Sequence, residues 1–219
     1  MRIAVLLAGS GVYDGSEIYE TTLTLLALDK ADANYQCIAP NIPQHHVINH
    51  ATGDEAAGES RNVLEEAARL ARGEVLDMAE AKAQDYDALI VPGGFGVAKN
   101  LCDFAFKGAE MQVNPQVKAF IQSFHQAGKP VGLMCIAPVM SAAIFGEGVR
   151  CTLGTDKETA AAVEAMGAVH EAKQVHEIAV DEKNKLVTTP AYMEATRIRD
   201  AAEGIEALVK EVLRLAQAS

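Results

Sequence analysis

The amino-acid sequence predicts an α/β protein in which helices cover both faces of a mostly parallel sheet. Short apolar runs that end near Gly, Pro or Asn alternate along the chain with longer stretches of helical period. The runs are apolar at almost every position, which is typical of strands buried on both faces. Because ligands of such sheets bind outside the carboxyl ends of the strands, residues that follow a strand are the first candidates for function.

Each element follows from its local pattern. The apolar runs predict strands at Ile3–Ala8, Tyr35–Ala39, Ala88–Val91, Val131–Met134 and Arg150–Leu153. Apolar residues at helical spacing predict helices at Ile18–Leu28, Arg61–Arg72, Val117–His125, Thr159–Met166 and Ala195–Ala216. A polar turn at 181–185 separates two further apolar runs, so Glu177–Val180 and Leu186–Thr189 are expected to form a hairpin.

Length and composition predict a single domain over residues 1–219. A 23.3 kDa chain with 49% hydrophobic residues is large and apolar enough to fill one continuous core. The region at about 41–85 interrupts the alternation, because it carries three histidines and the glycine- and acid-rich turn Gly53–Glu59. We expect an insertion packed over the sheet edge, since no composition shift marks a second domain.

Charge and cysteine content limit the classes of binding partner and the compartment that the sequence predicts. A net charge of -11 argues against nucleic acid and against an acidic membrane, and favours a small-molecule substrate. The four cysteines are scattered, which predicts neither a disulfide framework nor a zinc cluster and indicates a reducing compartment. The first apolar run is too short for a signal or spanning segment. We therefore expect a soluble cytoplasmic protein, unless a targeting segment was removed ahead of this numbering.

The segment Val131–Pro138 is the main candidate for chemistry. An apolar run breaks at Cys135 and resumes with a helix-like pattern, which is typical of a nucleophile elbow. Near a helix N-terminus the thiol pKa is expected below its ordinary value of about 8.5, so that Cys135 reacts as a thiolate. The alternative is that Cys135 is only a small buried hydrophobic residue.

Two other strand ends carry candidate groups. The glycine-rich turn Pro92–Gly96 lets backbone N–H groups approach a ligand and can form half of an oxyanion hole, although it can equally be an ordinary turn. It lacks the Lys-Ser/Thr pair of a phosphate-binding loop. Asp14–Glu20 leads into the first helix, where carboxylates usually cap the helix. Glu20 is also placed to bond the thiol or to act as a general acid and base.

The histidines argue against a cysteine hydrolase. Ile136 follows the candidate nucleophile directly, so no base stands at the adjacent position. His176-Glu177 is the remaining pair before a strand, with an ordinary surface role as the alternative. His46 and His50 have a spacing that suits a metal, but no third ligand is near. We expect no metal site.

Several motifs together resemble a known family. They are Gly9–Glu20, Ile48–Gly53, Thr188–Met193 and the two motifs around Pro92 and Cys135. In this order and over nearly the whole length, the sequence resembles the PfpI-type, class I glutamine amidotransferase-like superfamily. The resemblance implies a flavodoxin-like three-layer sandwich with a nucleophile elbow.

The resemblance also implies roles for individual residues. Cys135 matches the elbow nucleophile and Glu20 the acid, with Glu17 as the alternative acid. The oxyanion-binding N–H groups are expected on Gly94 and Ile136. Members with peptidase activity carry histidine directly after the nucleophile, so Ile136 argues against protease or glutaminase activity.

The activity that the resemblance implies is that of a glutathione-independent glyoxalase, a lyase of the hydro-lyase type. Such an enzyme converts a 1,2-dicarbonyl and water into a hydroxy acid without cofactor or metal. The same chemistry acts on glycated proteins, as a deglycase does, and the family favours a homodimer. Two alternatives use the same residues: a redox-sensing regulatory protein in which Cys135 is oxidised, and an amidotransferase-like subunit that needs a partner.

Overall fold

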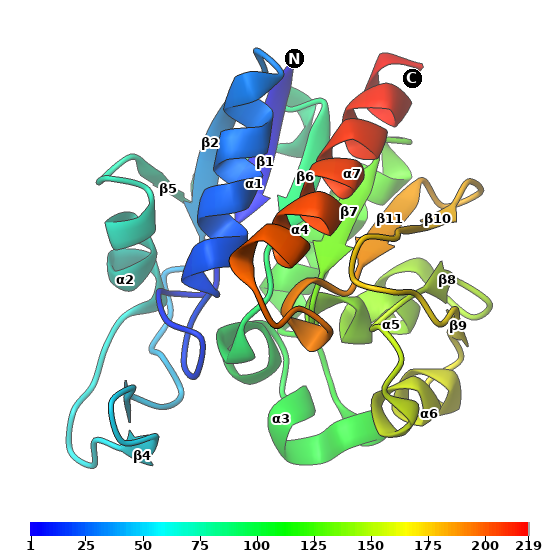
Figure 1. The fold of residues 1–219 in the computed structure, drawn as a ribbon. Helices are drawn as coiled ribbons and strands as arrows, with labels where there is room; N and C mark the ends of the chain where they lie inside the picture. Colours follow the sequence, from blue (N-terminus) through cyan, green and yellow to red (C-terminus); the bar gives the residue numbers. More distant parts are fainter. Residues whose placement is uncertain (219) are drawn as a thin grey trace.

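A seven-stranded sheet forms the centre of the protein (Figure 1). The computed structural model describes residues 1–218. The strand order is β10-β11-β7-β6-β1-β2-β5, and only β10 runs antiparallel to its neighbour. The strands are β1 (Arg2–Leu6), β2 (Asn34–Ala39), β5 (Val75–Asp77), β6 (Ala88–Val91), β7 (Val131–Met134), β10 (Ala179–Asp181) and β11 (Leu186–Thr189).

Helices cover both faces of this sheet, so the predicted fold class is confirmed. One face carries α1 (Ile18–Lys30), α2 (Val63–Leu70) and α7 (Ile198–Gln217). The other face carries α3 (Phe104–Lys107), α4 (Pro115–Gln126), α5 (Ser141–Phe145) and α6 (Lys157–Ala165). In Figure 1, α1 and α7 lie side by side in front of the sheet and α4 lies behind it. None of the helices in residues 1–218 is both long and apolar enough to cross a membrane.

The central strands are apolar on both faces because each face has its own core. In the first strand and the residues that follow it, Ile3, Val5 and Leu7 pack toward α1 and α7, whereas Ala4 and Leu6 pack toward α4. This alternation is the period of two that a strand imposes on its side chains. Gly132 in β7 leaves room for α7, since a Cβ there would lie 2.8 Å from Leu208 Cδ2.

The segment 41–85 is only partly an insertion. It carries the small antiparallel pair β3 (Ile48–Asn49) and β4 (Asp54–Glu55), which lies apart from the main sheet. Its last part, however, returns to the sheet, because β5 pairs in parallel with β2 and becomes the edge strand. The sequence did not predict this strand, since its few residues are too short a run to show a period.

The predicted strand at 150–153 is shorter than expected and lies outside the main sheet. Here β8 (Arg150–Cys151) pairs with β9 (Val169–His170) as a separate ladder. The predicted hairpin is present as β10 and β11. Single-turn helices complete the chain at η1 (Met78–Glu80), η2 (Ala83–Asp85), η4 (Gly108–Glu110), η5 (Ala137–Met140) and η6 (Ala191–Met193), together with the π-helix η3 (Val97–Leu101).

Candidate active site

Four neighbouring strands bring the candidate residues together. The strands β11, β7, β6 and β1 are adjacent and parallel, so their carboxyl ends meet at one edge of the sheet. Cys135 directly follows β7, and Gly93 follows β6 after one residue. Glu20 lies on α1, which follows β1, and Tyr192 follows β11. Both termini lie at the opposite end of the molecule (Figure 1).

Cys135 occupies a sharp turn. Its φ angle is 59°, a left-handed conformation that is uncommon for a residue with a side chain. Its N–H donates to the carbonyl of Thr189 at 3.0 Å, so the next strand holds the turn in place. The chain then continues into η5 and α5. This strand, turn and helix are the arrangement of a nucleophile elbow.

Glu20 is fully buried beside this thiol. One oxygen, Oε2, accepts the N–H of Gly93 at 2.7 Å, and the other, Oε1, accepts the N–H of Tyr192 at 3.2 Å. The carboxyl group also forms a side-chain hydrogen bond with Cys135. Three strand ends therefore fix the carboxyl group against the sulfur.

Glu17 has a different role. It is the N-cap of α1, and its carboxylate accepts the N–H of Glu20 at 2.7 Å. Burial is the main cause that raises its pKa. Of the two acids that the sequence left open, Glu20 bonds the thiol, while Glu17 begins the helix that carries Glu20.

Only glycine fits at position 93. An ideal Cβ there would overlap the Cβ of Cys135 and would lie 2.7 Å from Glu20 Oε2 and 3.0 Å from the sulfur. The next residue, Gly94, has a φ angle of 103°, which favours glycine. The glycine pair thus lets the backbone pass directly against both candidate side chains.

The two candidate groups perturb each other's pKa. Burial is the main cause that raises the pKa of Glu20 to about 7, and the hydrogen bond from Cys135 opposes it. Burial, followed by the charge of Glu20, raises the pKa of the Cys135 thiol well above its usual range. The N–H groups of Gly94 and Ile136 lie at the sulfur and lower that pKa.

The expected resting thiolate is therefore wrong. The sequence argument relied on a helix N-terminus, but the chain after Cys135 first makes the single turn η5 and then the short α5. Such a short helix supplies little dipole. Burial and a neighbouring carboxylate outweigh it, so Cys135 and Glu20 form a coupled pair in which the pKa of each group is raised.

Backbone hydrogen bonds from the N–H groups of Gly94 and Ile136, the expected oxyanion donors, lower the pKa of the Cys135 thiol. They come from two different strand ends, after β6 and after β7. A negative charge that develops at the sulfur, or on an atom bonded next to it, lies close to these two donors. The site can therefore stabilise an anion without a side-chain cation.

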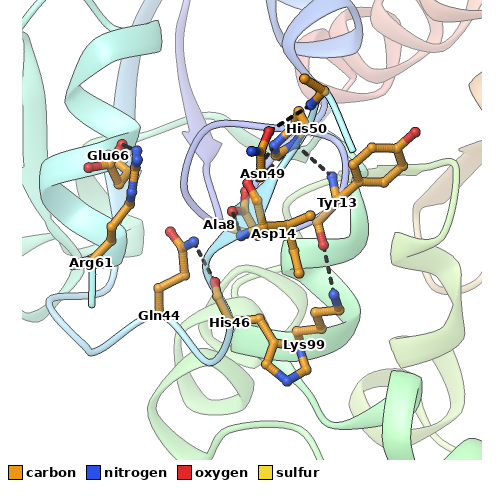
Figure 2. A network of polar contacts seen from close by, with 12 residues as sticks. Ala8, Tyr13, Asp14, Gln44, His46, Asn49, His50, Arg61, Glu66 and Lys99 are labelled. Carbon is orange, nitrogen blue, oxygen red and sulfur yellow. Dashed lines mark hydrogen bonds and ion pairs between the residues drawn. The ribbon is translucent and has the colours of Figure 1, made fainter. Parts of the chain in front are cut away.

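His50 holds the loop after β1 rather than approaching Cys135. Its Nε2 accepts the N–H of Tyr13 at 3.1 Å, and Nδ1 lies 3.0 Å from the carbonyl of Ile48 (Figure 2). Since Nε2 accepts, Nδ1 is the donor. Asp14 accepts the N–H of Ile48 at 2.8 Å, and Lys99 donates to the carbonyl of Tyr13 at 2.8 Å. This network joins the loop between β1 and α1 to the residues around β3.

The other histidines also have structural neighbours. The His46 ring packs edge-on against Phe106 and points away from His50 in Figure 2. His176 is exposed, and the carboxylate of Glu177 accepts the N–H of Gln174. Within residues 1–218, no three His, Cys, Asp or Glu side chains are grouped so that they could hold a metal ion.

Sequence reasoning missed two supports of the site. The N–H of Tyr192 donates to Glu20, and nothing in the motif Thr188–Met193 that contains Tyr192 indicates this contact. Asn100, on η3, donates to the carbonyls of Ala8 at 3.0 Å and Asp14 at 3.1 Å, and so holds the loop between β1 and α1. No pattern in the sequence indicates Asn100.

Known proteins resemble this chain over most of its length. The sequence profile of the DJ-1/PfpI family matches residues 1–198. The human glutamine amidotransferase-like class 1 domain-containing protein 3, mitochondrial, is 48% identical, over 98% of this chain and 83% of that protein. The crystal structure of an isoprenoid biosynthesis protein with an amidotransferase-like domain from Ehrlichia chaffeensis has a TM-score of 0.91 and 34% identity, over 98% of this chain and 99% of that one.

A more distant structure shares only the fold. It is the glyoxalase III from Candida albicans, with a TM-score of 0.60 and 11% identity, over 96% of this chain and 97% of that one.

The expected cytoplasmic location is contradicted. The human relative is named mitochondrial, and two further relatives, from Rattus norvegicus and Danio rerio, carry the same location in their names. The expectation rested on free cysteines and on a short first apolar run. Free cysteines indicate reducing conditions, and a short apolar run indicates a buried strand. Neither feature specifies a compartment of the cell.

Proposed function

Because the chain belongs to the DJ-1/PfpI family, we propose that it is a glutathione-independent glyoxalase, which converts a 1,2-dicarbonyl and water into a 2-hydroxy acid. One observation carries the proposal. The buried Cys135 thiol and the buried Glu20 carboxyl group lie together against Gly93 and share a hydrogen bond, and backbone hydrogen bonds from Gly94 and Ile136 lower the pKa of the same thiol. This arrangement provides a nucleophile, a proton carrier and an anion site within one cluster.

The proposed reaction begins at the aldehyde. Glu20 accepts the thiol proton as the sulfur of Cys135 bonds to the aldehyde carbon, and the proton then passes to the new oxyanion to give a hemithioacetal. The N–H groups of Gly94 and Ile136 stabilise the oxyanion before it is protonated. The pKa of about 7 suits Glu20 to both directions of transfer near neutral pH.

The remaining steps transfer hydrogen between the two carbons. Glu20 removes the proton from the carbon that bears sulfur and returns a proton to the neighbouring carbon. The first carbon is thereby oxidised to a thioester and the second is reduced to an alcohol. Water hydrolyses the thioester, which releases the hydroxy acid and restores the thiol. With glyoxal the product is glycolate.

Within the family, we propose that the chain is a glyoxalase of the ElbB type, the enhancing lycopene biosynthesis protein. Support comes from the motifs Gly9–Glu20 and Thr188–Met193, and from the likeness to a structure named as an isoprenoid biosynthesis protein. We also propose that the same adduct chemistry acts on glycated proteins and that the chain forms a homodimer. Ile136 supplies no base next to Cys135, which disfavours glutaminase chemistry.

The test is the formation of glycolate from glyoxal, without added thiol and after dialysis against EDTA. Wild type is expected to turn over. Cys135→Ala is expected to be inactive, and Glu20→Gln is expected to lose on the order of 100- to 10,000-fold because it cannot transfer protons. Glu17→Gln is the matched control, and it is expected to lose less because Glu17 caps α1.

Two results would contradict the proposal. Turnover that disappears on chelation and returns with zinc or nickel would indicate a metal mechanism. If folded wild type produces no hydroxy acid but Cys135 is oxidised reversibly by dilute peroxide, the redox-sensing alternative replaces the glyoxalase.

A further inference from the structure

A pocket of about 380 Å³ lies on the α6 side of the sheet, and Ile136, the residue after the nucleophile, is part of its wall. Its walls include Phe95, Phe104, Phe106, Ile136 and Ala162. Phe95 directly follows Gly94, and Ile136 directly follows Cys135. The residues that directly follow Gly94 and Cys135 in the chain therefore form part of the pocket wall.

The pocket is apolar and partly open. Phe95 is 48% exposed and Phe106 is 47% exposed, which is a large apolar surface to leave in water. Neighbours restrain both rings: the His45 ring centre lies 4.3 Å from that of Phe106, and Lys99 Nζ lies 5.6 Å from the ring centre of Phe95. The walls are therefore held in place around the opening.

The charge at the pocket selects against anions. Glu158, in the first turn of α6, is the only charged residue that lines it among the described residues. Asp156, the N-cap of the same helix, lies two residues earlier. Lys99 Nζ lies beside the Phe95 ring but donates to the carbonyl of Tyr13. A carboxylate or phosphate inside the pocket would therefore meet the charge of Glu158 without a cation in the pocket lining. A neutral, apolar group suits these walls.

We propose that this pocket binds the substituent of the substrate, and that the substituent is a neutral, ring-sized apolar group such as an aryl ring. The inference rests on the proposed function, because it assigns the pocket to the dicarbonyl that reacts with Cys135. The volume of about 380 Å³ lies at the lower end of the range for small-molecule sites. A phenyl ring in contact with these phenylalanines gains from edge-to-face packing as well as from burial.

The experiment compares phenylglyoxal with glyoxal, which lacks a substituent. We measure kcat/KM for both with wild type, with Ala162→Leu, which fills the pocket, and with Ala161→Leu. Ala161 lies on the exposed side of the same helix and is the matched control. The ratio of the two kcat/KM values is expected to fall at least about tenfold in Ala162→Leu and to stay within about twofold in Ala161→Leu.

A binding measurement separates this inference from the proposed function. In Cys135→Ala, neutral mandelamide is expected to bind more tightly than glycolamide by NMR titration, and adding Ala162→Leu is expected to remove the difference. If wild type turns over no dicarbonyl, the proposed function fails while this difference in binding still supports the pocket.

Equal binding of the two amides, or a ratio that is the same in both leucine variants, would overturn the inference. A change of oligomeric state in Ala162→Leu with an unchanged ratio would also overturn it, because the pocket would then belong to a contact between two copies of the chain.

Discussion

Cys135 and Glu20 illustrate how burial and proximity set the chemistry of a pair. In water each group would ionise near its ordinary pKa, but burial in the site raises the pKa of both groups. At neutral pH the thiol therefore keeps its proton, and Glu20, whose pKa is about 7, is about half protonated. The reactive thiolate therefore forms during the reaction, when Glu20 accepts this proton.

We predict that Cys135 is the fastest of the four cysteines to react with limiting iodoacetamide. Its thiol has an adjacent base in Glu20 and two N–H groups that stabilise the developing negative charge. Cys37, Cys102 and Cys151 are buried, and burial raises the pKa of each without such a base. Peptide mapping by mass spectrometry measures the order. Earlier labelling of any of these three would contradict the prediction.

We predict that the buried acid makes wild type less stable as the pH rises. The pKa of Glu20 is about 7 in the folded protein and near its ordinary value of 4.5 when unfolded, so the folded state binds more protons between these values. The contribution of protonated Glu20 to the unfolding free energy is fully present below pH 4.5 and is lost as the pH rises through 7. The loss amounts to about 3 kcal/mol of unfolding free energy.

Glu20→Gln tests this prediction, because glutamine does not titrate. Urea unfolding at pH 5 and pH 8 is expected to show a smaller loss in the variant than in wild type. The variant also gives up one acceptor for the N–H groups of Gly93 and Tyr192, but that effect is the same at both pH values. An equal loss in both proteins would contradict the prediction, because it would show that Glu20 does not change its protonation between pH 5 and pH 8.

The turn after β6 is the element on which the site depends most. It brings the Gly93 N–H to the Glu20 carboxylate and the Gly94 N–H to the sulfur. These contacts require glycine, because a Cβ at position 93 would overlap Cys135 and a Cβ at position 94 would overlap the backbone of Gly15 and Glu17. The turn is thus held by Glu20 on α1 and by Cys135 after β7 as well as by its own conformation.

We predict that Gly93→Ala loses at least about 100-fold in glyoxal turnover, because its Cβ displaces the sulfur or the carboxylate from the hydrogen-bonded position. Gly58→Ala is the control: its φ angle of 87° makes alanine unfavourable there, but nothing lies within 4 Å of the new Cβ. The control is expected to keep its turnover. Circular dichroism checks that both variants are folded, and full turnover by folded Gly93→Ala would refute this role of the turn.

The whole molecule is organised around one sheet with a core on each face. Both cores share the central strands, so neither can open without exposing the other. Even the segment 41–85 returns to the sheet as β5. We propose that residues 1–219 form a single domain on this basis.

We predict that this domain unfolds in one step. Far-UV circular dichroism and the loss of protection of Cys37, a buried thiol on β2, against alkylation are expected to give the same urea midpoint, because both depend on the same sheet. An early loss of protection at Cys37, before the helices unfold, would divide the molecule into separate units.

The sequence alone determined the alternation of strands and helices, the elbow at Cys135 and the candidate acid at Glu20. These features are local: an apolar run, a glycine pair or a carboxylate in the first turn of a helix is visible within a few residues. The edge strand β5 was not visible, since its short run takes its strand conformation from pairing with β2.

Only the tertiary structure decided the state of the site. The pKa of Cys135 depends on burial and on Glu20, which is distant along the chain, so the local helix argument gave the wrong direction. The N–H of Tyr192 binds Glu20 only because β11 is the neighbour of β7. Charges and hydrogen bonds act through space, and their balance is set by which strand ends meet.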